Sequence, residues 1–421
     1  MTEPCFAPWP SFTDEEAEAV RDVLLSNKVN YWTGDICRIF EREFAEWTGT
    51  HHAIALTNGT VAIDLALNAL QIGAGDEVVV TPRTFLASVS SVVNAGATPV
   101  FADVELDSGN ISARTIEKVL TPRTKAIVCV HLAGWPCDMD PIMDLARERG
   151  LKVIEDCAQA HGAVYKGRRV GSIGHVGAWS FCQDKIMTTG GEGGMVTTND
   201  KDLWSRMWSY KDHGKSYDAV YNRPHPPGFR WLHESFGTNW RMLEVQAAIG
   251  RIQLRRMDDW SRLRQKNADL LSGALHDLTG DLGPIRIPTL ANNLGTDPAG
   301  DFASTSLHAN YRLYAYLRPE NVLPDWNRER ILSEVAKQKL PVFQGTCSEV
   351  YLEKAFDSTE YRPAERLPNA RELGDTSLAF LVHPTLTSEE IGRIGAGVAE
   401  ILSGASIVAD SRLRQLDKLP L

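Results

Sequence analysis

Residues 153–162 have the sequence VIEDCAQAHG. The stretch opens with an apolar run that ends in two carboxylates, Glu155 and Asp156, and this is the pattern of a buried strand with polar side chains at its carboxyl end. Carboxylates in such a place are costly to remove from water unless they meet a cation or hydrogen bonds. Asp156 is therefore either a structural ion-pair partner or helix cap, or a group that meets a protonated ring nitrogen of a bound coenzyme.

Similar strand patterns lie on both sides of this stretch. From about residue 50 to residue 200, short β-branched runs alternate with segments of helical period, as in a mostly parallel sheet flanked by helices. The expected strands are 53–56, 77–81, 98–104, 125–131, 152–155, 178–181 and 194–198, with helices over 61–70, 85–95 and 113–120 among them. Because loops converge at the carboxyl edge of such a sheet, we expect the active site there.

After Asn199 the alternation stops. Helical patterns at 201–210, 242–258 and 260–271 lead to a turn-rich connection at 278–304. Strand and helix signals return at 311–317, 328–338 and 389–402. Residues 410–421 are expected to form a loose tail. Single cores stop growing at roughly 250–300 residues. We therefore expect a large α/β domain over 1–260, including an N-terminal arm, and a small α+β domain over 261–421.

Composition excludes several classes of function. The 421 residues are 43% hydrophobic and 23% charged, and the net charge of −10 argues against a nucleic-acid-binding surface. The chain shows neither a signal peptide nor an apolar run of about 18 residues, so we expect no membrane contact and a cytoplasmic location. The seven cysteines form no CxxC pair and no His/Glu spacing indicates a ligand set, so no metal is predicted.

A second candidate residue is Lys185. It stands between the strand pattern that ends near Ser180 and the glycine-rich stretch GGEGG at 190–194. A lysine that is poorly solvated in this way can have a lowered pKa and react as an amine, and the glycines indicate close backbone approach to something bulky. The alternative is a surface lysine beside a hairpin turn.

A third element is the sequence TNGT at 57–60, between a strand and a helix that starts near Val61. Gly59 followed by Thr60 at a helix N-terminus presents free backbone N–H groups and the positive end of the helix dipole to an anion. Thr60 could equally be an ordinary N-cap. Only the combination with Lys185 and Asp156 favours a phosphate site.

Together these motifs resemble the DegT/DnrJ family of sugar aminotransferases, from Trp32 to the C-terminal helix. The resemblance implies a fold-type-I aminotransferase architecture with a mostly parallel, mixed seven-stranded sheet, a large domain that binds pyridoxal 5'-phosphate, and a Schiff base between that cofactor and Lys185. By the same match Asp156 pairs with the pyridine nitrogen and Gln159 lies against the phenolic oxygen. Phe85 is placed over the ring, although without the resemblance it would be assigned to the core.

The resemblance also implies a shared active site. Gly59, Thr60 and Ser180 are matched to phosphate ligands within the subunit, and Asn239 to a residue that reaches the phosphate of the neighbouring subunit. We therefore expect a homodimer in which the segment 213–240 lies at the interface. Two departures are visible: one glycine more than the family pattern between Lys185 and Glu192, and Cys-Gln-Asp at 182–184 where relatives have histidine or asparagine.

The implied reaction is a ping-pong transamination from L-glutamate to a keto sugar carried on a nucleoside diphosphate. The sequence around Lys185 resembles that of family members that aminate carbon 4 more than that of members that aminate carbon 3. Amination at carbon 3, or of a keto-cyclitol, stays open. A dehydratase of the same fold would have histidine in place of Lys185, and a non-catalytic relative is the remaining alternative.

Overall fold

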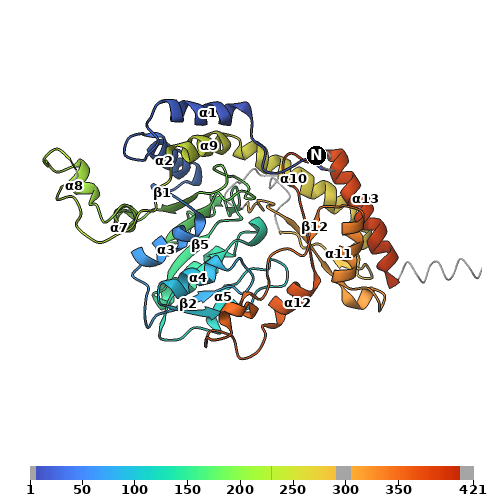
Figure 1. The fold of residues 1–421 in the computed structure, drawn as a ribbon. Helices are drawn as coiled ribbons and strands as arrows, with labels where there is room; N and C mark the ends of the chain where they lie inside the picture. The colour runs from blue at the N-terminus through green and yellow to red at the C-terminus, as the bar shows by residue number, and fades with distance from the viewer. Residues whose placement is uncertain (1–5, 229, 291–304, 408–421) are drawn as a thin grey trace, which may run out of the picture.

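The computed structural model describes residues 6–228, 230–290 and 305–407, and its centre is a seven-stranded sheet in the order β1-β9-β8-β5-β4-β2-β3 (Figure 1). The strands are β1 (His52–Leu56), β2 (Glu77–Val80), β3 (Thr98–Phe101), β4 (Thr124–Val130), β5 (Lys152–Asp156), β8 (Val176–Ser180) and β9 (Gly194–Thr198). Neighbouring strands from β3 to β8 are parallel, while β9 is antiparallel to both of its neighbours. The predicted mixed sheet is confirmed, and each of the seven predicted strands lies in it.

Helices cover both faces of this sheet. Alternate residues of a strand point to opposite faces, so Val78 and Val80 pack into one core cluster and Val79 into another. One face carries α3 (Gly59–Ala69), α4 (Ala87–Asn94) and α7 (Lys201–Tyr210); the other carries α2 (Ile36–Thr48), α5 (Ala113–Glu117), α6 (Met139–Arg149) and α9 (Glu244–Arg255). Because both faces are buried, the strands are nearly continuous apolar runs.

A second, antiparallel sheet lies in the C-terminal part, in the order β10-β11-β13-β12. Its strands are β10 (Ile285–Arg286), β11 (Leu313–Leu317), β12 (Val342–Phe343) and β13 (Ser377–Phe380), and it packs with α10 (Met257–Ala274), α11 (Arg328–Lys337) and α13 (Ser388–Ala405). The domain boundary near residue 260 stays a prediction. Residues 291–304 of the expected connection and the expected tail 410–421 lie outside the described residues.

Smaller elements complete the chain. They are α1 (Asp14–Leu25), α8 (Tyr217–Tyr221), α12 (Pro368–Thr376) and the two-stranded sheet of β6 (Val164–Tyr165) and β7 (Arg168–Arg169). None of the helices in the described part of the chain combines the length and the apolar composition that crossing a bilayer requires.

Candidate active site

A cavity of about 620 Å³ lies where β4, β5 and β8 end and α3 begins. Seven of the eight residues predicted from the sequence line it, namely Gly59, Thr60, Phe85, Asp156, Gln159, Ser180 and Lys185. A neighbouring cavity of about 590 Å³ shares Phe85, Gln159 and Lys185 and takes its other wall from the C-terminal part of the chain. The residues predicted from the sequence therefore lie together at the carboxyl edge of the sheet.

Asp156 is the last residue of β5 and is buried at the floor of the first cavity. Its Oδ2 atom accepts a hydrogen bond from the Ser88 hydroxyl at 2.7 Å, and its Oδ1 atom accepts one from the N–H of Ala158 at 3.1 Å. The described side chains include no cation paired with Asp156, so the structural ion pair considered above is absent. The carboxylate keeps lone pairs for a proton-bearing ligand in the cavity.

Gln159 and Ser180 are oriented by backbone contacts. The amide oxygen of Gln159 accepts a hydrogen bond from the N–H of Ala133 at 2.8 Å, so its NH₂ group is the donor left for a ligand. The hydroxyl oxygen of Ser180, at the end of β8, accepts one from the N–H of Cys182 at 3.3 Å. Both side chains are more than nine-tenths buried and line the cavity.

Lys185 lies between the two cavities. Its side chain is 17% exposed, its Nζ atom lies 3.6 Å from Oδ1 of Asp184, and it sits 5.4 Å from the ring centroid of Tyr311. The alternative of a solvated surface lysine is therefore wrong. An amine so placed can attack a carbonyl group in either cavity.

The start of α3 forms a backbone cradle. The N-cap is Asn58, whose side chain accepts a hydrogen bond from the N–H of Val61 at 3.0 Å, so Thr60 is not the cap. A Cβ atom on Gly59 would lie 2.5 Å from the Cβ of Ser180, and one on Gly194 would lie 2.2 Å from the carbonyl oxygen of Asn58. Glycines at these two places thus let the helix N-terminus approach the end of β8, and the first-turn N–H groups suit a phosphate.

Phe85 is 71% exposed and lines both cavities. A phenylalanine in the core would be buried, so the core alternative is wrong. An exposed aromatic ring at the mouth of a polar cavity is suited to stacking on a flat ligand.

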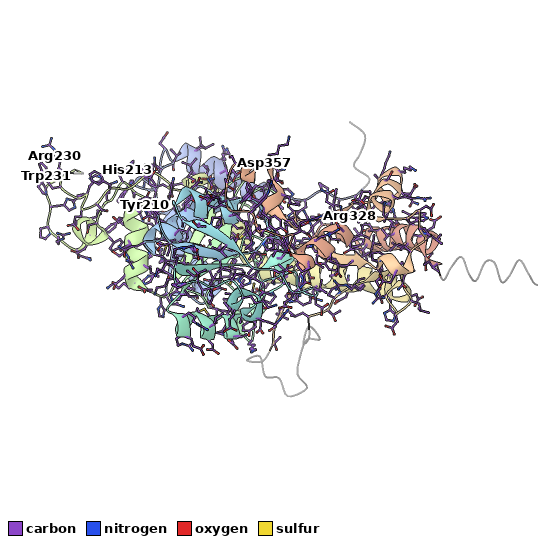
Figure 2. The ribbon with its side chains drawn as sticks, turned by 90° about the horizontal axis from the view of Figure 1, so that it is seen from below. Tyr210, His213, Arg230, Trp231, Arg328 and Asp357 are labelled. Carbon is purple, nitrogen blue, oxygen red and sulfur yellow. The ribbon has the colours of Figure 1, made fainter. Side chains whose placement is uncertain are left out.

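Asn239 is the one predicted residue that lies outside both cavities, and it is exposed. It belongs to a projecting arm, residues 213–240, which has Arg230 and Trp231 at its outer end and Tyr210 near its base (Figure 2). The base is held by buried Asp212, which accepts hydrogen bonds from Lys215 at 2.8 Å and from Arg241 at 2.7 Å. Within the described part of one subunit, Asn239 does not line either cavity.

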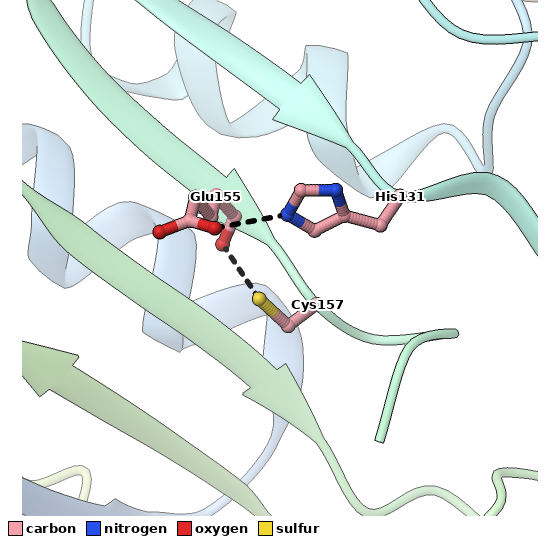
Figure 3. Close-up of side chains that lie close together, drawn as sticks. All are labelled: His131, Glu155 and Cys157. Carbon is pink, nitrogen blue, oxygen red and sulfur yellow. Dashed lines mark hydrogen bonds and ion pairs between the residues drawn. The ribbon is translucent and has the colours of Figure 1, made fainter. Parts of the chain in front are cut away.

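His131, Glu155 and Cys157 form a buried cluster at the carboxyl ends of β4 and β5 (Figure 3). Both carboxylate oxygens of Glu155 already accept backbone N–H bonds, from Gly171 at 2.8 Å and from Gly174 at 2.6 Å. The Nδ1 atom of His131 accepts from the N–H of Cys137 at 3.0 Å, which leaves Nε2 as the N–H that faces Glu155 at 3.1 Å. With these atoms committed, the cluster braces the end of β5 and does not present a ligand set for a metal ion.

Three polar residues near Lys185 were not predicted from the sequence. Tyr311 donates its hydroxyl to Asp184, and the guanidinium of Arg312 lies 3.9 Å from the same carboxylate and 4.5 Å from the Tyr311 ring. Burial opposes the charge of Asp184, but Lys185, the Tyr311 hydroxyl and Arg312 outweigh it and hold the pKa of that carboxyl below its usual value. The only local signal in the sequence for this group of residues was the position of Asp184 next to Lys185.

The groups that line the first cavity fit pyridoxal phosphate. A helix N-terminus with two close-packed glycines suits the phosphate, the amine of Lys185 suits the aldehyde, and the carboxylate of Asp156 suits a protonated ring nitrogen. These groups line one cavity of sufficient size for a drug-sized ligand.

Comparison with known proteins agrees with this chemistry. Residues 10–399 match the profile of the DegT/DnrJ/EryC1/StrS aminotransferase family. The chain is 42% identical over 269 residues to a GDP-perosamine synthase of Escherichia coli O157:H7, a match covering 64% of this chain and 71% of that protein. It is 39% identical over 278 residues to a dTDP-3-amino-3,4,6-trideoxy-alpha-D-glucose transaminase of Streptomyces venezuelae, covering 65% and 70%.

A solved structure is more similar still. The X-ray structure of an aminotransferase from Psychrobacter cryohalolentis is 61% identical, with a TM-score of 0.91 over 95% of this chain and 99% of that one. Aminotransferases of the matched family depend on pyridoxal phosphate in general, and two of the relatives are named as a GDP-perosamine synthase and a dTDP-amino-sugar transaminase. The chain therefore belongs to the DegT/DnrJ/EryC1/StrS aminotransferase family and is an aminotransferase with the fold-type-I architecture.

Proposed function

We propose that the protein moves an amino group from L-glutamate to carbon 4 of a 4-keto-6-deoxy sugar carried on a nucleoside diphosphate, for amino-sugar or surface-polysaccharide biosynthesis. The observation that carries the proposal is the convergence of Lys185, Asp156 and the Gly59 cradle on one cavity. The names of the relatives support a nucleotide-linked substrate. Amination at carbon 3 is the second candidate, because one relative is named for a 3-amino product.

The cofactor assignment follows from the fit described above. Gly59, Thr60 and Ser180 would hold the phosphate of pyridoxal phosphate, Asp156 its ring nitrogen, Gln159 its phenolic oxygen, and Phe85 would cover its ring. When bound, this cofactor supplies an electron sink for the negative charge that develops at the amino-acid Cα atom. Asp156 would serve that chemistry by keeping the ring nitrogen protonated.

Lys185 is the group that moves protons. Lys185 lines both cavities, so its amine could attach the cofactor and, once free, take a proton from the donor Cα atom and deliver it to the cofactor carbon that carried the aldehyde. The charge on neighbouring Asp184 is balanced by the Tyr311 hydroxyl and Arg312. Together with Lys185, these two groups hold the pKa of the Asp184 carboxyl below its usual value.

Arg312 supports a dicarboxylate as amino donor. It and Lys185 are the only cationic side chains among the described residues that line the second cavity. The ion pair of Arg312 with Asp184 is long, at 3.9 Å, and the guanidinium fork matches carboxylate geometry. We propose that it binds a carboxylate group of L-glutamate.

The active enzyme is proposed to be a homodimer in which the arm 213–240 of one subunit brings Asn239 to the phosphate of the other. Support comes from two exposed aromatic side chains on the arm, Trp231 at 87% and Phe236 at 99% exposure. Side chains of this size contribute most when they are buried at an interface.

The proposed chemistry is tested by replacing Lys185. The Lys185→Ala variant should form no cofactor adduct that borohydride can reduce, whereas Lys339→Ala, at an exposed turn, should form it as the unaltered protein does. An adduct of full yield in Lys185→Ala would refute the role of this lysine.

The substrate is tested by a screen. Glutamate is mixed with keto sugar nucleotides that carry the keto group at carbon 3 or carbon 4, and with a free keto-cyclitol, and release of 2-oxoglutarate is measured. We expect turnover with a 4-keto nucleotide sugar. Turnover with the keto-cyclitol alone would transfer the assignment to that class.

A further inference from the structure

The peptide groups at Lys185 are held from two directions. The N–H of Lys185 donates to the carbonyl oxygen of Cys182 at 3.1 Å, which is a contact within the same turn. The carbonyl oxygen of Lys185 accepts a hydrogen bond from the indole Nε1 of Trp9 at 2.9 Å, from 176 positions away in the chain. The N-terminal arm thus contacts the main chain of the proposed cofactor lysine directly.

The indole of Trp9 is fixed by its own neighbours. Its ring packs edge-on against Trp260 with centroids 5.1 Å apart and stacks on His383 at 5.9 Å. The guanidinium of buried Arg264 lies 5.0 Å from the ring centroid. Because three side chains hold the ring, its N–H direction is set before any ligand binds.

The residues before Trp9 are tied to the C-terminal part of the molecule. Phe6 packs against the core of the C-terminal sheet, the N–H of Ala7 donates to Glu390 at 2.7 Å, and the carbonyl oxygen of Pro8 accepts from the Thr385 hydroxyl at 2.8 Å. Figure 1 shows the chain before α1 running past α10 to α13. Residues 6–10 therefore form a strap between the C-terminal part and the lysine.

The rest of the lysine loop is held by the large sheet and its helices. The N–H of Thr188 donates to the side chain of Gln253 on α9 at 2.9 Å, and the Thr188 hydroxyl donates to the carbonyl oxygen of Phe181 at 2.9 Å. Lys185 therefore lies where a loop anchored in the large part meets a strap anchored in the C-terminal part. Its Nζ atom is the reacting atom, and small displacements of a reacting atom are costly in rate.

We propose that Trp9 is a positioning residue for Lys185, and that the strap of residues 6–10 transmits the position of the C-terminal part to the cofactor lysine. The proposal rests on the proposed role of Lys185 as the cofactor-binding amine. Trp9 takes no part in the chemistry. It fixes the peptide from which the reactive side chain starts.

The test uses Trp9→Phe in the full chain, which keeps an aromatic ring and removes the N–H donor. In the cofactor-free protein, amide hydrogen exchange in residues 181–189 should become faster by about three- to tenfold, the range expected for one lost neutral hydrogen bond. In the cofactor-bound protein, the midpoint pH at which the cofactor absorbance changes should differ from that of the unaltered protein. The single-turnover rate with glutamate should fall by a similar factor while the KM for glutamate holds.

Trp326→Phe is the matched control, because Trp326 also belongs to the C-terminal part and packs on Arg330 at 4.1 Å. It should leave exchange in residues 181–189 unchanged. Thr385→Val, which removes the strap anchor at Pro8, should change exchange in the same direction as Trp9→Phe. This variant also covers the case in which Trp9→Phe does not fold.

Two outcomes overturn the proposal. One is exchange and titration in Trp9→Phe equal to those of the unaltered protein, and the other is an equal change in Trp326→Phe, which indicates general loosening. Failure of the proposed function would look different. The unaltered protein would then give no borohydride-reducible adduct, while the exchange measurement on the cofactor-free protein would still report on the Trp9 contact.

Discussion

Gly59 shows how one missing side chain shapes the site. The Cβ atom that any other residue would add lies 2.5 Å from the Cβ of Ser180, a distance that real contacts essentially never reach. Either α3 or the end of β8 would have to move, and both contribute proposed phosphate ligands. The expected loss therefore falls on cofactor binding.

We predict that Gly59→Ala weakens pyridoxal phosphate binding at least about tenfold, because the helix N-terminus is pushed away from the phosphate. The measurement is a titration of cofactor-free protein followed by absorbance. Gly273→Ala on α10 is the control, since its added Cβ would meet nothing within 4 Å. Equal affinities of the two variants for pyridoxal phosphate would contradict the proposed role of Gly59 in the phosphate site.

Arg312 permits a test of the amino donor. Arg312→Gln should raise the KM for glutamate by about 10- to 100-fold, the range for a lost hydrogen bond to a charged group, and leave the KM for the keto sugar nucleotide nearly unchanged. Steady-state kinetics with each substrate varied in turn would measure both. A change confined to the sugar nucleotide would show that Arg312 serves the acceptor instead.

Local sequence signals predicted some of these residues and not others. Gly59, Asp156 and Lys185 each stand at a strand end or a helix start, where a short pattern is enough to place them. Trp9 contacts Lys185 across 176 positions, and Arg312 contacts the neighbouring Asp184 across about 130 positions. No short pattern encodes such a contact, because it depends on how the two sheets pack together.

The strands of the large sheet were predictable because most are buried on both faces and are nearly continuous apolar runs, whereas edge strand β3 has one face only partly buried. The helices α1, α2 and α6 were not predicted. Of these, α2 ends at Gly49 with a left-handed φ of 75°, a C-terminal signal that a sequence can show. In α6 the proline at position 141 and five charged residues obscured the apolar spacing.

The arm 213–240 gives a prediction about assembly. We expect the double change Trp231→Ser and Phe236→Ser to raise the dimer dissociation constant by at least about tenfold, since burying an aromatic side chain is worth roughly 1.5–3 kcal/mol. Analytical ultracentrifugation over a concentration series would measure it. Leu282→Ser, another exposed apolar residue but one outside the arm, is the control. An unchanged dissociation constant would place the interface elsewhere.

A buried histidine near the site should make the stability of the folded protein sensitive to acid. His161 is fully buried between Trp179 and Phe181, and neither of its ring nitrogens has a hydrogen-bond partner within the described residues. Burial, with the charges of Lys185 and Arg264 in support, lowers its pKa to about 3. The folded protein thus keeps His161 neutral while the unfolded chain takes up a proton below about pH 6.5.

Stability should therefore fall as the pH drops from about 6.5 to about 3, and His161 should account for up to about 1.4 kcal/mol per pH unit of that slope. We predict a shallower slope in His161→Phe, measured by denaturant unfolding of the cofactor-free protein at several pH values. His276→Gln, at an exposed position, should keep the slope of the unaltered protein. A slope in His161→Phe as steep as in that control would exclude the contribution.

The second cavity has two walls of different origin. Lys185, Gln159 and Phe85 come from the large sheet and its loops, while Phe343, Gly345, Thr346, Cys347, Val350 and Glu353 come from one continuous stretch of the C-terminal part. A single short peptide, residues 343–353, thus supplies much of the wall opposite Lys185, beside Tyr311, Arg312, Tyr314 and Ala379. Exchanging that peptide would change the shape of the second cavity and leave Lys185 and Gln159 on the opposite wall in place.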